Sequence, residues 1–143
     1  MKKLLLVLSC IVFFGCNKND NNYNCNFLLD LGVNLTVNLN LPQFNQLLFP
    51  GSAIRVEGQG NEGIILVRAN GDSILAWDGA DPNHPPSACS AMTISGLNAV
   101  CGCGDGNEYS LILGTAINDN PQPCTLKPYR VEAIGNNTYF VSN

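Results

Sequence analysis

The sequence predicts an all-β protein, built as a small antiparallel β-sandwich or barrel. Three observations lead to this prediction. The segment NLTVNLNL at 34–41 alternates apolar and polar residues without interruption, as a half-buried antiparallel strand does. Short apolar runs recur between glycine, proline and asparagine residues. No window of helical length shows a 3.6-residue period.

The first predicted strand, at 34–41, directs four apolar side chains to the core face: Leu35, Val37, Leu39 and Leu41. Further strands are predicted at 53–58, 63–69, 73–79, 97–101, 108–114, 127–134 and 138–142. Tight turns are predicted at ANGD (69–72) and IGNNT (134–138), because asparagine and glycine tolerate positive φ. Short strands at this spacing suit one small β domain.

The N-terminal residues 1–15 are predicted to form a bacterial lipoprotein signal peptide. Two lysines precede an apolar run that is too short for a permanent membrane span but has the length of a secretory h-region. The run ends at Gly15-Cys16, which resembles a lipobox, where the cysteine is acylated and becomes the new N-terminus. Cys10 is a rival position, but cleavage there would leave an h-region of only about six residues. We therefore expect a lipid on Cys16, which anchors the chain in the bacterial cell envelope, in the outer membrane.

The segment that follows Cys16 is polar and rich in asparagine, so residues 16–30 are predicted to be a flexible tether. Residues 31–143 are predicted to form one β domain. Loss of residues 1–15 changes the formal net charge from −4 to −6. An acidic domain with no basic cluster excludes nucleic acid as an expected partner.

Two segments have the arrangement of paired ligand loops on a β scaffold. ILAWDGADPNHPPSACSAM at 74–92 places an apolar strand before an aspartate-rich turn, and VCGCGDGNEYSLILG at 100–114 starts at a cysteine that closes a strand. With the tail PQPCTLKPYRVEAIGNNTYFV at 121–141, these segments resemble the Rieske iron–sulfur domain. The resemblance implies a Rieske-like β fold with a [2Fe–2S] cluster, held by Cys-x-His on one loop and Cys-x-x-His on the other.

The ligand set that the resemblance implies is incomplete in this sequence. His84 matches the first-loop histidine, and Cys101 matches the second-loop cysteine. The first-loop cysteine position falls at Asp81 or Pro82, and the second histidine position holds Gly104. Two ligands are too few for the cluster, so we expect no metal and no cofactor. If a metal is bound, His84 and Cys101 are its expected ligands.

The resemblance also implies that Cys89 and Cys103 form a disulfide that joins the two loops, and an oxidising compartment favours this bond. A second disulfide between Cys101 and Cys124 is possible. Cys25 with Cys124 is the competing pair, and the sequence does not choose between them.

A single metal ion is an alternative to a cluster, because one histidine and three cysteines near the loops form a set that zinc prefers. The position of His84 argues against a metal ion, because a histidine that precedes two prolines is more often a rigid loop residue than a ligand. The carboxylates that flank the loops are expected to be solvated: Asp78, Asp81, Asp105 and Glu108. Trp77 and Tyr109 are interpreted as core aromatics.

The predicted function is that of a lipid-anchored envelope protein whose Rieske-like domain has lost two cluster ligands. It would serve as a non-redox binding or structural module with an unidentified protein or small-molecule partner. The alternative is an electron carrier that uses [2Fe–2S] or another metal with a divergent ligand set. No serine stands in a nucleophile-elbow motif, so the sequence gives little support to hydrolytic catalysis.

Overall fold

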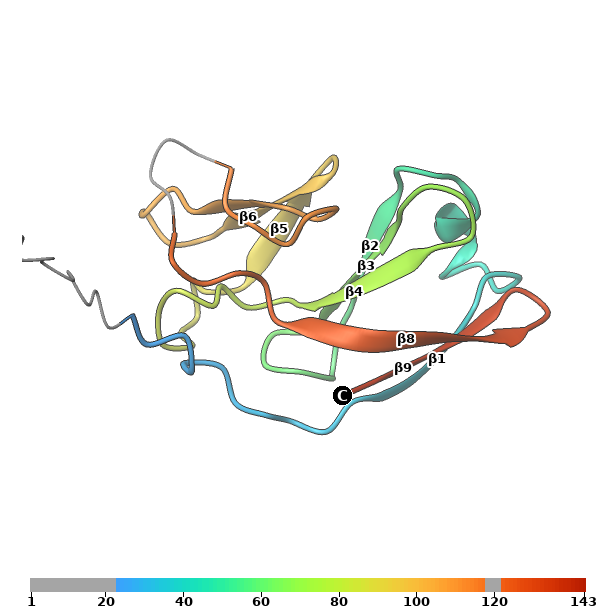
Figure 1. The fold of residues 1–143 in the computed structure, drawn as a ribbon, viewed down its shortest axis with the longest axis horizontal. Coiled ribbons are helices and arrows are strands. Elements are labelled where there is room, and N and C mark those ends of the chain that lie inside the picture. The colour runs from blue at the N-terminus through green and yellow to red at the C-terminus, as the bar shows by residue number, and fades with distance from the viewer. Residues whose placement is uncertain (1–22, 118–121) are drawn as a thin grey trace, which may run out of the picture.

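The computed structural model describes residues 23–117 and 122–143 and shows an antiparallel β protein with two sheets (Figure 1). The larger sheet has six strands in the order β1-β9-β8-β4-β3-β2, and the smaller has three in the order β5-β6-β7. The strands are β1 (Asn34–Asn38), β2 (Ala53–Val56), β3 (Ile64–Arg68), β4 (Ile74–Asp78), β5 (Met92–Ser95), β6 (Asn98–Cys101), β7 (Glu108–Ser110), β8 (Pro128–Gly135) and β9 (Thr138–Ser142). The predicted all-β fold class is confirmed.

Strand β3 lies between the two hydrophobic clusters of the core. All five of its residues are buried, which explains why the first four, Ile64 to Val67, form a continuous apolar run rather than an alternating one. Ile64 and Leu66 pack in one cluster, and Ile65 and Val67 pack in the other. Because successive strand residues point to opposite faces, β3 supplies apolar side chains to both halves of the domain.

Strand β1 is shorter than the alternation predicts. It ends at Asn38, whose side-chain oxygen accepts a hydrogen bond from the Asn40 amide at 2.9 Å. The asparagine thereby starts a turn that competes with the strand ladder. Val37 and Leu39 are buried, but Leu41 lies beyond the turn and is 43% exposed.

Both predicted turns are present. Gly71, in the turn between β3 and β4, has a φ of 64°. Asn136 and Asn137, between β8 and β9, have φ values of 50° and 56°, as a two-residue hairpin turn requires. The sequence reasoning missed β5 and the 3-10 helix η1 (Asn45–Leu48).

The folded part of the chain begins before residue 31, where the domain was expected to start. Cys25 is disulfide-bonded to Cys124. The Leu29 amide donates a hydrogen bond to the Asn61 side chain at 2.8 Å, and Lys127 donates one to the Leu29 carbonyl at 2.7 Å. Residues 25–29 are therefore fastened to the domain, and the part of the expected tether before residue 23 lies outside the described residues. In the described ranges, no helix has the length and apolar character needed to cross a membrane.

Candidate metal centre

Two loops on the small sheet carry the candidate site. The first loop, at 79–91, joins β4 to β5, and the second, at 102–107, joins β6 to β7. Pairing of Met92 with Cys101 brings the ends of the loops together. A Cβ at Gly102 would lie 2.7 Å from the Cys89 carbonyl oxygen, so only glycine allows the loops to pack this closely.

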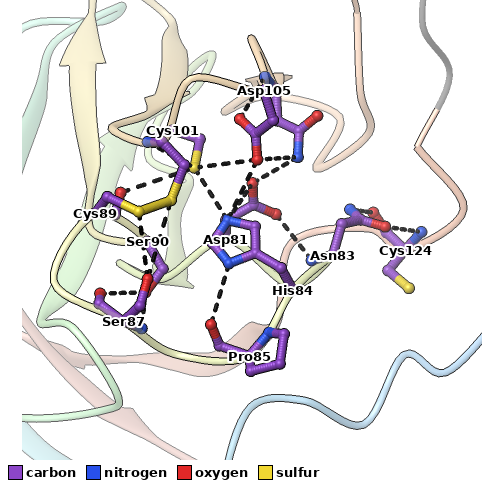
Figure 2. A network of polar contacts seen from close by, with 12 residues as sticks. Asp81, Asn83, His84, Pro85, Ser87, Cys89, Ser90, Cys101, Asp105 and Cys124 are labelled. Carbon is purple, nitrogen blue, oxygen red and sulfur yellow. Dashed lines mark hydrogen bonds and ion pairs between the residues drawn. A yellow bond between two sulfur atoms is a disulfide. The ribbon is translucent and has the colours of Figure 1, made fainter.

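Four potential metal donors meet between the loops (Figure 2). The Nε2 atom of His84 lies 3.3 Å from Cys101 Sγ, 3.5 Å from Asp81 Oδ2 and 3.4 Å from Asp105 Oδ2. Asp81 and Cys101 are buried, whereas the side chains of His84 and Asp105 are 22% and 34% exposed. The site therefore has a buried floor and an open side.

Asp81 is a buried carboxylate that accepts hydrogen bonds from three residues. Burial alone would raise its pKa. Hydrogen bonds from the Tyr109 hydroxyl at 2.6 Å, the Asn107 side chain at 2.8 Å and the Asn83 amide at 2.8 Å outweigh burial and lower the pKa. The side chain is therefore ionised, and its negative charge favours a cation nearby.

Cys101 is a buried free thiol. Burial raises its pKa to about 12, and the neighbouring Asp81 and Asp105 carboxylates contribute to the shift. The Cys103 amide lies 3.4 Å from Cys101 Sγ and partly offsets the shift as a donor. The thiol is therefore neutral at physiological pH, and a bound metal ion would have to displace its proton.

The structure joins Cys89 to Cys103, the pair implied by the resemblance. The possible pair of Cys101 and Cys124 is wrong, because Cys124 is bonded to Cys25 and Cys101 is free. The Cys124 amide donates a hydrogen bond to the Asn83 side chain at 3.0 Å, which fixes this segment beside the first loop. Figure 2 shows the Cys124 sulfur directed away from Cys101, which faces His84 instead.

The expectation of no metal and no cofactor is corrected by the grouping of these side chains. His84, Cys101, Cys103 and Asp105 present donor atoms that all lie within 4.8 Å of one another, which points to a possible metal or cluster site. The sequence named His84 and Cys101 as the ligands only if a metal is bound, and it assigned the loop carboxylates to solvent. Asp78 and Asp81 are buried instead, and each is held by a tyrosine hydroxyl from a segment distant in the sequence.

The donor spacing fits one ion better than a cluster of two irons. An ion bonded tetrahedrally to nitrogen, oxygen and sulfur at about 2.0–2.3 Å separates its donors by about 3.3–3.8 Å. The distances from His84 Nε2 to its three neighbours, 3.3, 3.4 and 3.5 Å, match this spacing. In a Rieske cluster, histidine and cysteine ligands sit on different irons. Here His84 contacts Cys101 directly, and Cys103 is held in a disulfide.

No protein-family model and no curated protein sequence matches the chain. Among solved structures, it is similar to the ferredoxin of carbazole 1,9a-dioxygenase from Nocardioides aromaticivorans IC177, with 15% identity and a TM-score of 0.47 over 77% of this chain and 95% of that one. It is also similar to a putative NADH-dependent nitrite reductase small subunit from Mycobacterium tuberculosis, with 19% identity and a TM-score of 0.46 over 80% and 97% of the two chains. These similarities carry no information about the chemistry of this site.

The fold is Rieske-like. Two sheets of antiparallel strands support two loops that a disulfide joins, as the sequence predicted. Sequence reasoning missed the supporting role of Asn83, Asn107 and the Tyr109 hydroxyl in this Rieske-like domain. Tyr109 was interpreted as a core aromatic and is fully buried, but its hydroxyl also holds Asp81.

Proposed function

We propose that this chain is a lipid-anchored bacterial envelope protein whose Rieske-like domain is a module that binds one divalent metal ion and carries no electrons through it, with Zn²⁺ as the best fit. The observation that carries the proposal is the contact of His84 Nε2 with Cys101 Sγ and the Asp81 and Asp105 carboxylates, at 3.3–3.5 Å. These four side chains are called the His-Cys-Asp site below.

The donor types favour zinc over the common hard cations. Mg²⁺ and Ca²⁺ prefer a shell of oxygen atoms, whereas imidazole and thiolate suit Zn²⁺ and its neighbours in the first transition row. One nitrogen, one sulfur and two carboxylates make a mixed set within the range that zinc accepts. When bound, the ion would neutralise the two carboxylates and act as a structural or Lewis-acidic centre.

Residues around the site prepare His84 and Asp81 to bind a cation. The Nδ1 atom of His84 lies 3.1 Å from the Pro85 carbonyl oxygen. A proton on Nδ1 satisfies this contact and leaves the Nε2 lone pair directed to the other donors. Tyr109 donates a hydrogen bond to Asp81 Oδ1 and Asn107 donates one to Asp81 Oδ2, so these two side chains fix the carboxylate. Such outer partners orient the ligands of protein metal sites.

Metal binding is tested on the purified mature chain by equilibrium dialysis against Zn²⁺. We expect one ion per chain, and an affinity at least about tenfold lower for Asp105→Asn. The matched control is Asp72→Asn, because the Asp72 side chain is 98% exposed and outside the site. Absence of binding, or equal affinities for the wild type and Asp105→Asn, would overturn the proposal.

The lipid anchor is tested by expressing the full chain in a bacterium and separating the membranes. We expect the wild type in the membrane fraction and Cys16→Ser unprocessed or released. Cys10→Ser is the control, because it removes the rival cysteine at residue 10 and should leave processing at Cys16 intact. If Cys16→Ser behaves like the wild type, the lipid is not attached at this residue.

A further inference from the structure

A fifth metal donor lies beside the His-Cys-Asp site but is held in a covalent bond. Cys103 Sγ lies within 4.8 Å of the donor atoms of His84, Cys101 and Asp105. The same sulfur is bonded to Cys89, so it cannot act as a thiolate ligand while the bond persists. We propose that the Cys89–Cys103 disulfide is a redox gate, whose reduction supplies Cys103 as a second thiolate to the metal. This inference rests on the proposed function.

The two sulfurs of the gate differ in their access to solvent, and this difference sets the direction of the reaction. Cys89 is exposed, whereas Cys103 is half-buried beside Cys101. A reductant in solution therefore reaches the Cys89 sulfur more easily. The sulfur released by an attack on Cys89 is that of Cys103, which lies beside the other donors.

The reductant is a dithiol. One of its thiolates attacks Cys89 Sγ, so that a mixed disulfide forms, the Cys89–Cys103 bond breaks and Cys103 leaves as a thiolate. The second thiol of the reductant then attacks the mixed disulfide and releases Cys89. The protein disulfide gains two electrons and the dithiol becomes a disulfide. Of the two protons that the dithiol gives up, one goes to the Cys89 thiol and the other to solvent, because Cys103 remains a thiolate on the metal. A metal ion bound by His84, Cys101 and Asp105 would stabilise the departing Cys103 thiolate and so favour reduction.

The loops keep their positions when this bond is broken, because other contacts hold them. The Met92 amide donates a hydrogen bond to the Gly79 carbonyl at 2.8 Å, and the Asp81 amide donates one to the Ser90 carbonyl at 2.9 Å. The Cys101 amide donates to the Asn107 carbonyl at 2.9 Å in the second loop. Reduction therefore changes the donor set from one available thiolate to two, while the bases of the loops stay in place. Because a thiolate is a soft ligand, the second thiolate favours ions such as Zn²⁺ and Co²⁺ over hard cations.

Two serine variants separate the donation of a thiolate from the loss of the crosslink. Cys89→Ser and Cys103→Ser both abolish the disulfide, but only Cys89→Ser leaves Cys103 free. Both variants keep Cys25 bonded to Cys124, which a chemical reductant would also open. The chains are purified under argon, and their free thiols are counted by alkylation and mass spectrometry before use.

The probe is Co²⁺, whose ultraviolet charge-transfer absorption grows with each bound thiolate. We expect Cys89→Ser to show about twice the absorption per ion of Cys103→Ser and an affinity at least tenfold higher. The oxidised wild type should show the single-thiolate absorption, as Cys103→Ser does. Equal spectra and affinities for both variants, with binding by the wild type, would overturn the gate and leave the proposed function standing.

The failure of the proposed function gives a different result. If neither variant nor the wild type binds Co²⁺, the proposed metal site and the proposed redox gate are both refuted. If only Cys89→Ser binds, the gate stands, and the claim that the oxidised protein binds metal is overturned.

Discussion

Removal of the Cys25–Cys124 disulfide is expected to lower the free energy of unfolding more than removal of the Cys89–Cys103 disulfide. The two perturbations are the double variants in which both cysteines of a pair are replaced by serine. A disulfide acts mainly by restricting the unfolded chain, and the restriction grows with the length of the loop that it closes. The paired cysteines are 99 residues apart in the first case and 14 in the second.

The magnitude follows from these separations. Loops of about 100 and about 15 residues correspond to about 4.7 and about 3 kcal/mol of stabilisation, a difference of about 1.7 kcal/mol. The folded state adds to this difference. Cys124 is only 3% exposed, so serine there buries a hydroxyl, whereas Cys89 is exposed. We therefore expect the long-range pair to stabilise the fold by at least about 1.7 kcal/mol more than the short-range pair.

The assay is urea denaturation at 25 °C with a metal chelator present. It is followed by circular dichroism and by the fluorescence of Trp77, the single tryptophan, whose indole donates a hydrogen bond to the Leu111 carbonyl at 2.8 Å. Coincident transitions from both probes justify a two-state analysis. An equal or greater loss of stability for the Cys89/Cys103 variant would refute the reasoning, because loop length would then not be the dominant factor.

Three further predictions concern individual side chains. Gly114→Ala should cost about 1–3 kcal/mol, because Gly114 has a φ of 72° and a Cβ there would lie 2.7 Å from the Trp77 ring. Tyr129→Phe should cost about 1.5–3 kcal/mol in urea denaturation, since it removes a buried 2.5 Å hydrogen bond to the Asp78 carboxylate. Cys101 should react with iodoacetamide far more slowly in the folded, metal-free protein than in urea. Its pKa is raised from 9.0 to about 12, so the neutral thiol stabilises the fold below pH 9, and this contribution is lost as the pH rises toward 12.

Two of these predictions have a control variant, and the third has a result that would contradict it. Gly96→Ala shares the positive φ of 62° but meets nothing within 4 Å, so it should cost less than Gly114→Ala. Tyr23→Phe alters an exposed tyrosine and should leave stability unchanged, and a similar cost at Tyr129 and Tyr23 would contradict the role of the buried hydrogen bond. For Cys101, equal alkylation rates in folded and unfolded protein would show that burial does not protect the thiol.

Strands were predictable where apolar residues occupy one face in alternation, and turns were predictable where asparagine or glycine residues lie together. The alternation before Asn38 and the paired asparagines at 136 and 137 are local patterns, and each is sufficient to predict the strand or turn that forms there. Strand β5 was missed because its four residues, MTIS, lie between a serine-rich loop and a glycine turn and give no long apolar pattern. The early end of β1 was missed because the Asn38 side chain competes with the ladder, which alternation alone does not reveal.

The site was predictable only in part, because it depends on contacts between distant segments. His84 and Cys101 stood out by residue type. Asp81 reads in the sequence as a loop carboxylate, and its burial follows from Tyr109, which lies 28 residues further along the chain. The partner of Cys124 could not be read either, since Cys25 lies 99 residues away and other pairings satisfied the same sequence.

The attachment of Cys25 to Cys124 also limits how far the domain could travel from a lipid bilayer. With a lipid on Cys16, nine residue steps separate the anchor from the disulfide, and even a fully extended chain spans only about 30 Å over that length. Cys124 is hydrogen-bonded to Asn83, the neighbour of His84. The N-terminal segment is therefore attached to the domain beside the two loops. The end of the domain that carries the loops would stay close to the headgroups while the β8–β9 hairpin swings outward. A macromolecule that engages the loops would therefore have to lie in the same membrane or be narrow enough to enter the gap beneath the domain.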